Sequence, residues 1–204
     1  MNHKENFINL YEIADIYSGI MINRSDFIEK NNFHSLNNKE YVNKYTYLPQ
    51  KAINQNNIDF KESKILFSKK IIDKKYIARK NDIIMKLTTP YDVFIFLKDF
   101  KEDLIISSKF AIIRLKNNVK FSPLFLSYCL NSYETKRQLH KFVEGTSLSI
   151  LKIHSLKKIK IKQIDLKKQE KFSKLFFLLN QKKELDKQKS ECENQLIYSI
   201  MYNL

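Results

Sequence analysis

Residues 165–200 read DLKKQEKFSKLFFLLNQKKELDKQKSECENQLIYSI, a stretch without proline or glycine. Its apolar residues, from Phe172 to Ile200, recur at helical spacing among charged residues. One continuous helix of this length would extend roughly 50 Å at 1.5 Å per residue, more than the diameter of a small domain. A helix that outreaches its own domain leaves part of its apolar stripe uncovered. The sequence therefore predicts a chain that works within an assembly.

The whole sequence is strongly basic. Its 204 residues include 37 Lys and Arg against 22 Asp and Glu, which gives a formal net charge of +15 and a pI near 9.6. A positive excess of this size attracts polyanions, with nucleic acid as the first expectation and an anionic membrane as the second. Lys, Asn and Ile are abundant throughout, so part of this charge is compositional. The charge supports nucleic-acid binding only together with the architecture.

Neither the cysteines nor the hydropathy indicates a compartment outside the cytoplasm. Cys129 and Cys192 are far apart, form no CxxC, and have no histidine at metal-ligand spacing. Both are expected to be buried small residues, so the fold should not depend on redox state. The sequence shows no signal-peptide pattern and no stretch near the ~20 apolar residues of a membrane span. We expect a cytoplasmic protein that does not bind a membrane.

The middle of the chain predicts β-structure. A first strand is expected over residues 10–17, ending at Ser18-Gly19, and residues 23–59 are polar and poorly periodic, which is typical of loops. Beyond them, short β-branched runs separated by turn residues favour strands over helices. These runs are residues 64–67, 76–78, 82–87, 93–97, 104–106 and 110–115.

Helices are expected in the last third. Ser122 before Pro123 is typical of a helix start, because serine caps free N–H groups and proline fits the first turn. A second helix is predicted over residues 133–143, followed by Gly145. A compact turn region over 146–156 and a strand over 158–164 precede Asp165, which is expected to cap the long helix.

Seven short stretches follow one another along the chain in an order that is informative. They are IADIYSG at 13–19, KNDIIMK at 80–86, AIIRL at 111–115, LFLSYCLNS at 124–132, GTS at 145–147, IKIKQI at 159–164 and LKKQ at 166–169. In this order they resemble the target-recognition half of type I restriction-modification specificity subunits. That family has an early strand ending in glycine, a "GDIL"-like strand entry, an "I-x-R" strand, a "Y-L-x-Y-x-L" helix, a Gly-Ser/Thr turn, an "I-x-I-P-x-P" strand and an "L-x-x-Q" entry to a spacer helix. No single motif is specific, but the series covers nearly the whole chain.

The sequence departs from the family pattern at two places. Asn81 stands where the family has glycine before Asp82, and asparagine tolerates a positive φ better than most residues, so the turn is expected to be kept. Lys162 and Ile164 stand where prolines are usual, which loosens the junction between the last strand and the long helix.

The resemblance implies an α+β fold, with a target-recognition domain over residues 1–164 and a long helix for pairing or docking over residues 165–204. Family members carry two such domains and two spacer helices, so this chain resembles a half-length subunit. It would pair with a second copy or another half and read a bipartite, palindromic site in double-stranded DNA. The chain itself would be non-catalytic and need no cofactor. S-adenosylmethionine, ATP and Mg²⁺ are expected only on its partners, the methyltransferase (M) and restriction (R) subunits.

Side chains that address DNA are concentrated in a few segments. Asn and Gln can grip adenine, Lys and Arg can donate to guanine, and hydroxyls can bind phosphate. The run over 41–57 is rich in such residue types, and its apolar residues follow neither a helical nor a strand periodicity. We therefore expect this run to read bases. A solvated loop is the alternative. The predicted DNA contacts are Arg24, Tyr41, Lys44, Tyr45, Tyr47, Gln50, Lys51, Asn54, Gln55, Lys86, Thr88, Thr89, Tyr91, Ser108, Lys109, Thr146 and Ser147.

The long helix fits a coiled-coil pattern in part. Lysines interrupt its apolar a/d positions, which weakens a seam but can fix its register. A helix that lies partly over its own domain is the alternative. The predicted pairing residues are Phe172, Leu175, Leu178, Leu179, Lys182, Leu185, Lys189, Cys192 and Leu196.

The sequence gives no support for catalysis. Asp59 and Glu62-Ser63-Lys64 imitate parts of a metal nuclease site but stand too close together in the chain, so a surface charge cluster is expected. With glycine only at 19 and 145, a cofactor-binding methyltransferase is also excluded. The alternative function is an assembly adaptor, or an orphan or decoy partner of a methyltransferase, with weak DNA binding.

Overall fold

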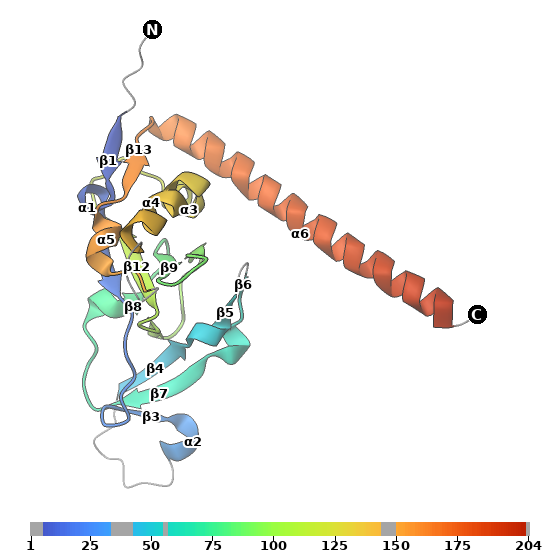
Figure 1. The fold of residues 1–204 in the computed structure, drawn as a ribbon. Coiled ribbons are helices and arrows are strands. Elements are labelled where there is room, and N and C mark those ends of the chain that lie inside the picture. The colour runs from blue at the N-terminus through green and yellow to red at the C-terminus, as the bar shows by residue number, and fades with distance from the viewer. Residues whose placement is uncertain (1–5, 34–42, 55–56, 144–149, 203–204) are drawn as a thin grey trace. The chain divides into compact units, whose positions relative to one another are not determined.

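The computed structural model describes residues 6–33, 43–54, 57–143 and 150–202. The chain divides into two units, Met1–Gln163 and Ile164–Leu204. The described strands all belong to the first unit, and the second is a single helix (Figure 1). Strands and helices are mixed, so the fold is α+β, as the sequence predicts.

Two sheets form the centre of the first unit. The four-stranded sheet has the order β10-β9-β12-β2 and contains β2 (Ala14–Ser18), β9 (Ile83–Lys86), β10 (Val93–Ile95) and β12 (Phe110–Leu115). The five-stranded sheet has the order β3-β7-β4-β11-β8 and contains β3 (Phe27–Glu29), β4 (Asn43–Leu48), β7 (Lys64–Ser68), β8 (Ile77–Ala78) and β11 (Leu104–Ile106). Two short pairs, β1 (Phe7–Asn9) with β13 (Lys160–Lys162) and β5 (Ile53–Asn54) with β6 (Asn57–Ile58), complete the strands.

The core joins the inner residues of both sheets. Ile84 and Ile112 of the four-stranded sheet and Leu48 and Ile106 of the five-stranded sheet belong to one buried cluster, and all four are fully buried. Strand β12 is central, and its Phe110–Ile113 residues are fully buried, which explains why this run is almost wholly apolar. Removing one such side chain, as in Ile112→Ala, would cost about 2–5 kcal/mol.

Helices gather at one end of the first unit. Figure 1 shows α1, α3, α4 and α5 near β1 and β13, with β3, β4 and β7 on the far side of β9 and β12. The predicted start of α3 is confirmed, because the Ser122 hydroxyl accepts the Phe125 N–H at 3.3 Å and Pro123 occupies the first turn. The helices are α1 (Leu10–Ile13), α2 (Lys30–Phe33), α3 (Pro123–Asn131), α4 (Tyr133–Val143) and α5 (Ile153–Lys157), with 3₁₀ turns η1 (Gln50–Ala52), η2 (Phe60–Glu62) and η3 (Lys74–Tyr76).

Three sequence predictions for this unit need correction. The predicted strand over 10–17 begins only at Ala14, because Glu12 accepts the N–H of Asn9 at 3.0 Å and this capping box forms the helical turn α1. The sequence predicts no strand over residues 23–59, but this segment contains β3 and β4. The turn region expected over 146–156 contains helix α5.

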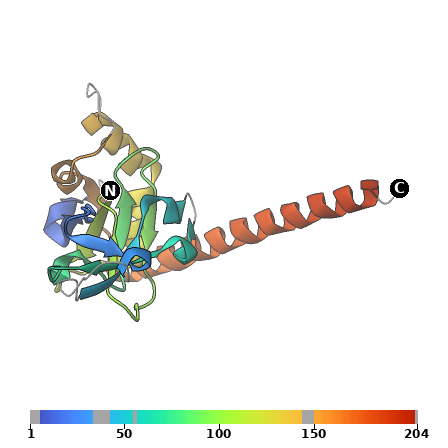
Figure 2. The ribbon, with the colours of Figure 1, turned by 90° about the horizontal axis from the view of Figure 1, so that it is seen from below.

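The second unit is the helix α6 (Leu166–Tyr202), which is unbroken in both views (Figures 1 and 2). The Asp165 carboxylate accepts the N–H of Lys168 at 3.0 Å, so the predicted N-cap is confirmed. This hydrogen bond also lowers the pKa of Asp165. Within the described ranges, no helix combines the length and the apolar content needed to cross a membrane.

Candidate nucleic-acid interface

The ends of four strands meet at one seam between the two sheets. Strands β4 and β11 are parallel, with Leu48 opposite Ile106, so the segments that follow them begin at the same edge. Strands β2 and β9 both run antiparallel to β12, with Ser18 opposite Ala111 and Lys86 opposite Phe110. Strands β2 and β9 therefore both end beside the start of β12. The turn that connects β11 to β12 lies at the same place.

Backbone hydrogen bonds tie these four strand ends together. The Ser107 N–H donates to the Leu48 carbonyl at 3.1 Å, which joins the end of β4 to the β11–β12 turn. The Leu87 N–H donates to the Lys109 carbonyl at 2.9 Å, which brings in the segment after β9. These hydrogen bonds satisfy backbone groups within the seam and hold the short segments that follow the strands in place.

Gly19 allows the two sheets to approach each other at this seam. A Cβ at this position would lie 2.2 Å from the Ser107 carbonyl oxygen, closer than any side chain tolerates. The neighbouring Ile20 N–H donates to Ile106 at 2.7 Å, and the Ser108 N–H donates to Ile20 at 3.0 Å. This close approach of two backbones explains why the early strand ends in glycine.

We name the side chains that follow these strand ends the strand-end surface. It consists of Gln50, Lys51, Lys86, Thr88, Thr89, Ser108 and Lys109. Gln50, Lys51, Thr89 and Lys109 are exposed, and the other three are half-buried. Lys51 forms an ion pair with Glu62, which offsets part of its charge. The seven residues come from three distant parts of the sequence, and all seven were predicted as DNA contacts.

Two predicted contacts are instead part of the core. Tyr45 is only 3% exposed, and its hydroxyl accepts the Ile72 N–H at 3.0 Å, because it points from β4 toward the loop before η3. Tyr91 is 1% exposed and packs edge-on against His140, with ring centres 5.5 Å apart. Neither ring presents a surface to DNA, so the prediction is wrong for both.

Three further predicted contacts lie away from the strand-end surface. Lys44 is near the start of β4 and donates to Glu102 at 2.5 Å, while Tyr47 is half-buried between its sheet partners Ile105 and Lys64. Arg24 is exposed in the turn before β3.

Other candidates cannot be placed. The predictions for Tyr41, Gln55, Thr146 and Ser147 lie outside the described residues, as does the side chain of Asn54. The Leu151 N–H, shortly after residues 144–149, donates to the Leu87 carbonyl at 2.8 Å.

A largely buried ion pair links the two sheets at the opposite end of β9 and β12 from the seam. The Arg114 guanidinium makes two parallel hydrogen bonds to Asp82, at 2.8 and 2.7 Å, and donates to the Ile77 carbonyl at 2.8 Å. The bonds to Asp82 raise the pKa of Arg114. Asp82 also accepts the Arg79 N–H at 2.8 Å across the turn at Asn81, whose φ is 69°. The expectation that asparagine keeps this turn is confirmed.

This pair joins two of the sequence motifs that carry the resemblance. Asp82 belongs to the "GDIL"-like entry and Arg114 to the "I-x-R" strand, and sequence reasoning missed that they meet. The signal was one acidic residue directly before an apolar strand and one basic residue within another, since a charge buried beside a core strand needs a partner.

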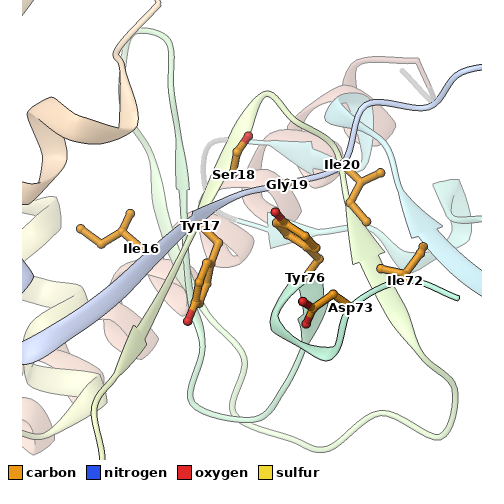
Figure 3. A pocket seen from close by; sticks show the side chains of 8 residues that line it. All are labelled: Ile16, Tyr17, Ser18, Gly19, Ile20, Ile72, Asp73 and Tyr76. Atoms are coloured by element: carbon orange, nitrogen blue, oxygen red, sulfur yellow. The ribbon is translucent and has the colours of Figure 1, made fainter.

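A hollow lies beside the end of β2. Its volume is about 550 Å³, and Figure 3 shows the side chains that line it, which are Ile16, Tyr17, Ser18, Gly19, Ile20, Ile72, Asp73 and Tyr76. The rings of Tyr17 and Tyr76 meet edge to face with centres 6.3 Å apart. The Asp73 carboxylate accepts the Lys75 N–H, which lowers its pKa, and it also pairs with the Lys75 ammonium at 2.9 Å. The hollow is thus mainly aromatic and apolar, and its one carboxylate is already ion-paired.

The residues that imitate a nuclease site have other roles. The Asp59 carboxylate caps η2 by accepting the Lys61 N–H at 2.9 Å. Glu62 pairs with Lys51, and Lys64 pairs with Glu29 at 2.6 Å. Across the part of the chain that the structure describes, no group of three or more His, Cys, Asp and Glu side chains is placed to hold a metal ion.

The predicted pairing residues of α6 are exposed. Leu178 is 51% exposed and Leu185 is 64% exposed, and Lys182 and Lys189 also face solvent. Cys192 is exposed and Cys129 is half-buried, so the expectation that both thiols are buried is wrong. Burial raises the pKa of the Cys129 thiol to about 12.

Comparisons with known proteins bear on the fold. No protein-family model and no curated protein matches this chain. A chain from a structure on "complex assembly and conformational transition of the type I R-M system" aligns over 96% of this chain with a TM-score of 0.63 and 13% identity. The HsdS subunit from Thermoanaerobacter tengcongensis aligns over 94% with a TM-score of 0.62 and 18% identity. The type I restriction-modification S subunit from M. genitalium aligns over 89% with a TM-score of 0.51 and 15% identity.

This chain spans less than half of each neighbour, covering 43%, 46% and 41% of their respective lengths. At such low identity the likeness concerns the fold alone. Both units of the chain are included, because the first two alignments cover 94% or more of this chain. The chain therefore has the fold of a type I restriction-modification S subunit, as the ordered motifs of its sequence predict.

Proposed function

We propose that this chain is a non-catalytic DNA-recognition subunit of a type I restriction-modification system. The observation that carries the proposal is the match of nearly the whole chain to the fold of S subunits. The net charge of +15 and the lysines and hydroxyls gathered on the strand-end surface support it. In this function the chain places a methyltransferase subunit, which binds S-adenosylmethionine and flips the target adenine, at its site on DNA.

Within this function, the strand-end surface contacts the DNA backbone and bases. Lys86 is the last residue of β9 and pairs with Phe110 across the sheet, and Lys109 is the residue immediately before Phe110. Their ammonium groups suit phosphate or guanine, and the Gln50 amide suits adenine. Two such domains, brought together through α6, would read the two halves of a bipartite site in the cytoplasm.

The test is DNA binding by the purified chain as a function of salt. Anisotropy of a labelled duplex is measured between about 50 and about 200 mM salt, where each phosphate contact contributes a slope of about −0.9 to log K against log salt. The double variant K86A/K109A should flatten the slope by about two contacts. The control K70A also removes an exposed lysine, but one that lies far from the strand-end surface. Lys70 follows Ser68, and Ser68 pairs with Asn43 at the opposite end of β4.

The outcomes separate the proposal from its alternative. A salt-dependent affinity that falls in K86A/K109A and stays unchanged in K70A supports recognition by the strand-end surface. An equal effect of all three lysines would show only general attraction of DNA. No binding even at the lowest salt would favour the adaptor function, which the exposed apolar residues of α6 already suit.

A further inference from the structure

The hollow beside the end of β2 is formed by two segments that are distant in the sequence. Residues 16–20 are the end of β2 and the two residues after it, and residues 72–76 include the turn η3. Both segments are held by hydrogen bonds, since the Ile20 N–H donates to a β11 carbonyl at 2.7 Å and the Ile72 N–H donates to the Tyr45 hydroxyl at 3.0 Å. The volume of about 550 Å³ lies within the range of ligand pockets, about 300–1,000 Å³. The hollow is therefore a fixed feature of the first unit with room for a ligand.

The rings of Tyr17 and Tyr76 form two walls of this hollow. Both side chains are half-buried, and their ring planes meet at 74° with centres 6.3 Å apart. A flat ligand that lies on the face of one ring therefore meets the edge of the other. Face-on and edge-on contacts are the two arrangements that aromatic groups prefer. The walls thus suit a flat aromatic ligand.

The charges around the rings disfavour a cationic ligand. Aromatic rings can hold a cation, but both rings already have one from this chain. The Lys75 ammonium lies 5.0 Å from the centre of the Tyr76 ring, and the Arg114 guanidinium lies 5.9 Å from the centre of the Tyr17 ring. The Asp73 carboxylate is paired with Lys75 at 2.9 Å, and the net charge of +15 repels a further cation. The ligand that fits has an uncharged ring and a negative charge elsewhere.

The Asp73 carboxylate can still accept a hydrogen bond from such a ligand. One of its oxygens accepts the Lys75 N–H at 2.9 Å and the other pairs with the Lys75 ammonium, so each oxygen keeps a lone pair for a ligand. The side chain is 55% exposed, and Figure 3 shows its carboxylate beside Tyr76. An ionised carboxylate accepts hydrogen bonds and donates none. It therefore favours a flat ligand that carries an amino group on its edge.

A nucleobase with an exocyclic amino group has all of these properties. Its ring is flat and uncharged, its amino group donates, and its phosphate carries the negative charge. In nucleic-acid recognition, carboxylates accept the N4 amino group of cytosine. Residues 74–80, directly after Asp73, contain four Lys and Arg and no acidic residue, so the phosphate meets a positive potential.

The base that enters this hollow must be unpaired. In a duplex the neighbouring base pairs cover both faces of a base, so a base lies on a tyrosine ring only in a single strand or after it leaves the stack. Two exposed apolar side chains extend the hollow outward. Met21, next to Ile20, is 69% exposed, and Ile71, next to Ile72, is 82% exposed. Because Ile and Met side chains pack against unstacked bases, we expect a strand of several nucleotides to bind better than a single nucleotide.

We propose that this hollow binds an unpaired nucleobase with an exocyclic amino group, whose ring lies against Tyr17 and Tyr76 and whose amino group donates to Asp73. The residues that line the hollow are separate from those of the strand-end surface. The chain would then have a second nucleic-acid site, for a single-stranded segment. This site goes beyond the recognition of double-stranded DNA and does not depend on it.

Two single strands that differ in the group facing Asp73 test the proposal. Labelled strands of about eight cytosine or uracil deoxynucleotides carry the same charge, and uracil has an oxygen in place of the amino group. Their affinities for the full-length chain are measured by fluorescence anisotropy at one salt concentration, so the phosphate contacts cancel in the ratio. We expect the wild type to bind the cytosine strand about tenfold more tightly, the effect of one hydrogen bond to a charged group.

Variants of Asp73 and Tyr76 separate the two contacts. D73N keeps an oxygen to cap η3 but replaces the other oxygen with an amide that donates, so the preference for cytosine should be lost. Y76L removes the ring and should weaken the binding of both strands by about fivefold or more, whereas Y76F should bind more tightly than Y76L. Y133L is the matched control, because Tyr133 is 78% exposed and does not line the hollow. Thermal melting shows whether each variant is folded.

Equal affinities of the wild type for the two strands would overturn the proposal. A cytosine preference that survives in D73N would also overturn it, and this measurement decides even if Y76L is unstable. Equal losses in Y76L and Y133L would show that strands bind exposed rings in general, which again rejects the hollow.

Competition with dCMP identifies the source of the base. Displacement of the labelled cytosine strand by dCMP, but not by dUMP, would assign the hollow to free nucleotides as well. A cytosine preference without displacement by dCMP would assign it to a strand. Displacement by both nucleotides alike would contradict the role of Asp73. Duplex binding by K86A/K109A is measured separately, so failure of this proposal is distinguishable from failure of the proposed function.

Discussion

At the scale of single residues, the most consequential contact is the ion pair between Arg114 and Asp82. Asp82 is 1% exposed, so removing its partner leaves a buried carboxylate without compensation. We expect R114A to lower the free energy of unfolding by about 3–5 kcal/mol. The matched control is R137A, which removes an exposed arginine whose partner Glu134 is also exposed, and it should cost below about 1 kcal/mol. Urea denaturation of both variants measures the difference, and equal losses would contradict the structural role of the pair.

Gly19 determines how closely the two sheets approach each other at the seam. In G19A the added methyl carbon would lie 2.2 Å from the Ser107 carbonyl oxygen. Hydrogen bonds hold the backbone in place on both sides of this contact. The two sheets must then separate, and we expect a loss of stability of about 1–3 kcal/mol. S18A, one residue earlier, is the control and should change little. A melting temperature of G19A equal to that of S18A would show that the two sheets can separate without loss of stability.

At the scale of elements, the sequence predicted the strands that are apolar by themselves. Runs such as 104–106 and 110–115 are β-branched, and the structure has strands at the same residues. Strand β4 was missed because it contains Asn43, Lys44 and Thr46 beside two tyrosines, and such a polar run reads as a loop when its sheet partners are unknown. Its residues form a strand because β7 and β11 pair with both of its edges.

The candidate site was predictable only as a set of residue types. Residue types pointed to Lys86, Ser108 and Lys109, and the structure places the backbones of these residues close together at the end of β9 and the start of β12. Their contact with DNA stays a prediction. Tyr45 and Tyr91 have equally suitable side chains for DNA, yet both are buried. Which face of a strand or turn a tyrosine occupies depends on tertiary packing, which residue type does not reveal.

The start of α6 gives a prediction that depends on pH. The N–H of Lys168 holds the pKa of Asp165 below its ordinary value of 3.8, so the ionised carboxylate favours the capped helix. That contribution is complete above the ordinary value and is lost as the pH falls through the lowered pKa. D165N keeps a capping oxygen that does not titrate. Circular dichroism from about pH 5 to about pH 2.5 should show wild type losing helix relative to D165N. Parallel profiles would contradict the cap.

At the scale of the whole molecule, the proposed function would make the length of α6 set a distance. The 37 residues of α6 extend about 55 Å, so two copies of the helix paired side by side in opposite directions would hold their starts at about that separation. The first unit of each copy joins α6 at that start. The distance between the two halves of a bound DNA site should therefore follow the length of α6, whatever the bases in each half.

A seven-residue insertion tests this dependence directly. Seven residues placed after Lys187 lengthen α6 and keep the heptad frame of the predicted pairing residues on both sides of the insertion. The helix starts then move apart by about 10 Å, which corresponds to about 3 base pairs of B-DNA. DNA selected from a random-sequence pool should show the same two half-sites with a gap longer by about 3 base pairs. The same seven residues placed after Tyr202 add length outside the paired segment and should leave the gap unchanged. If the gap stays constant in both variants, the spacing is set by something other than α6.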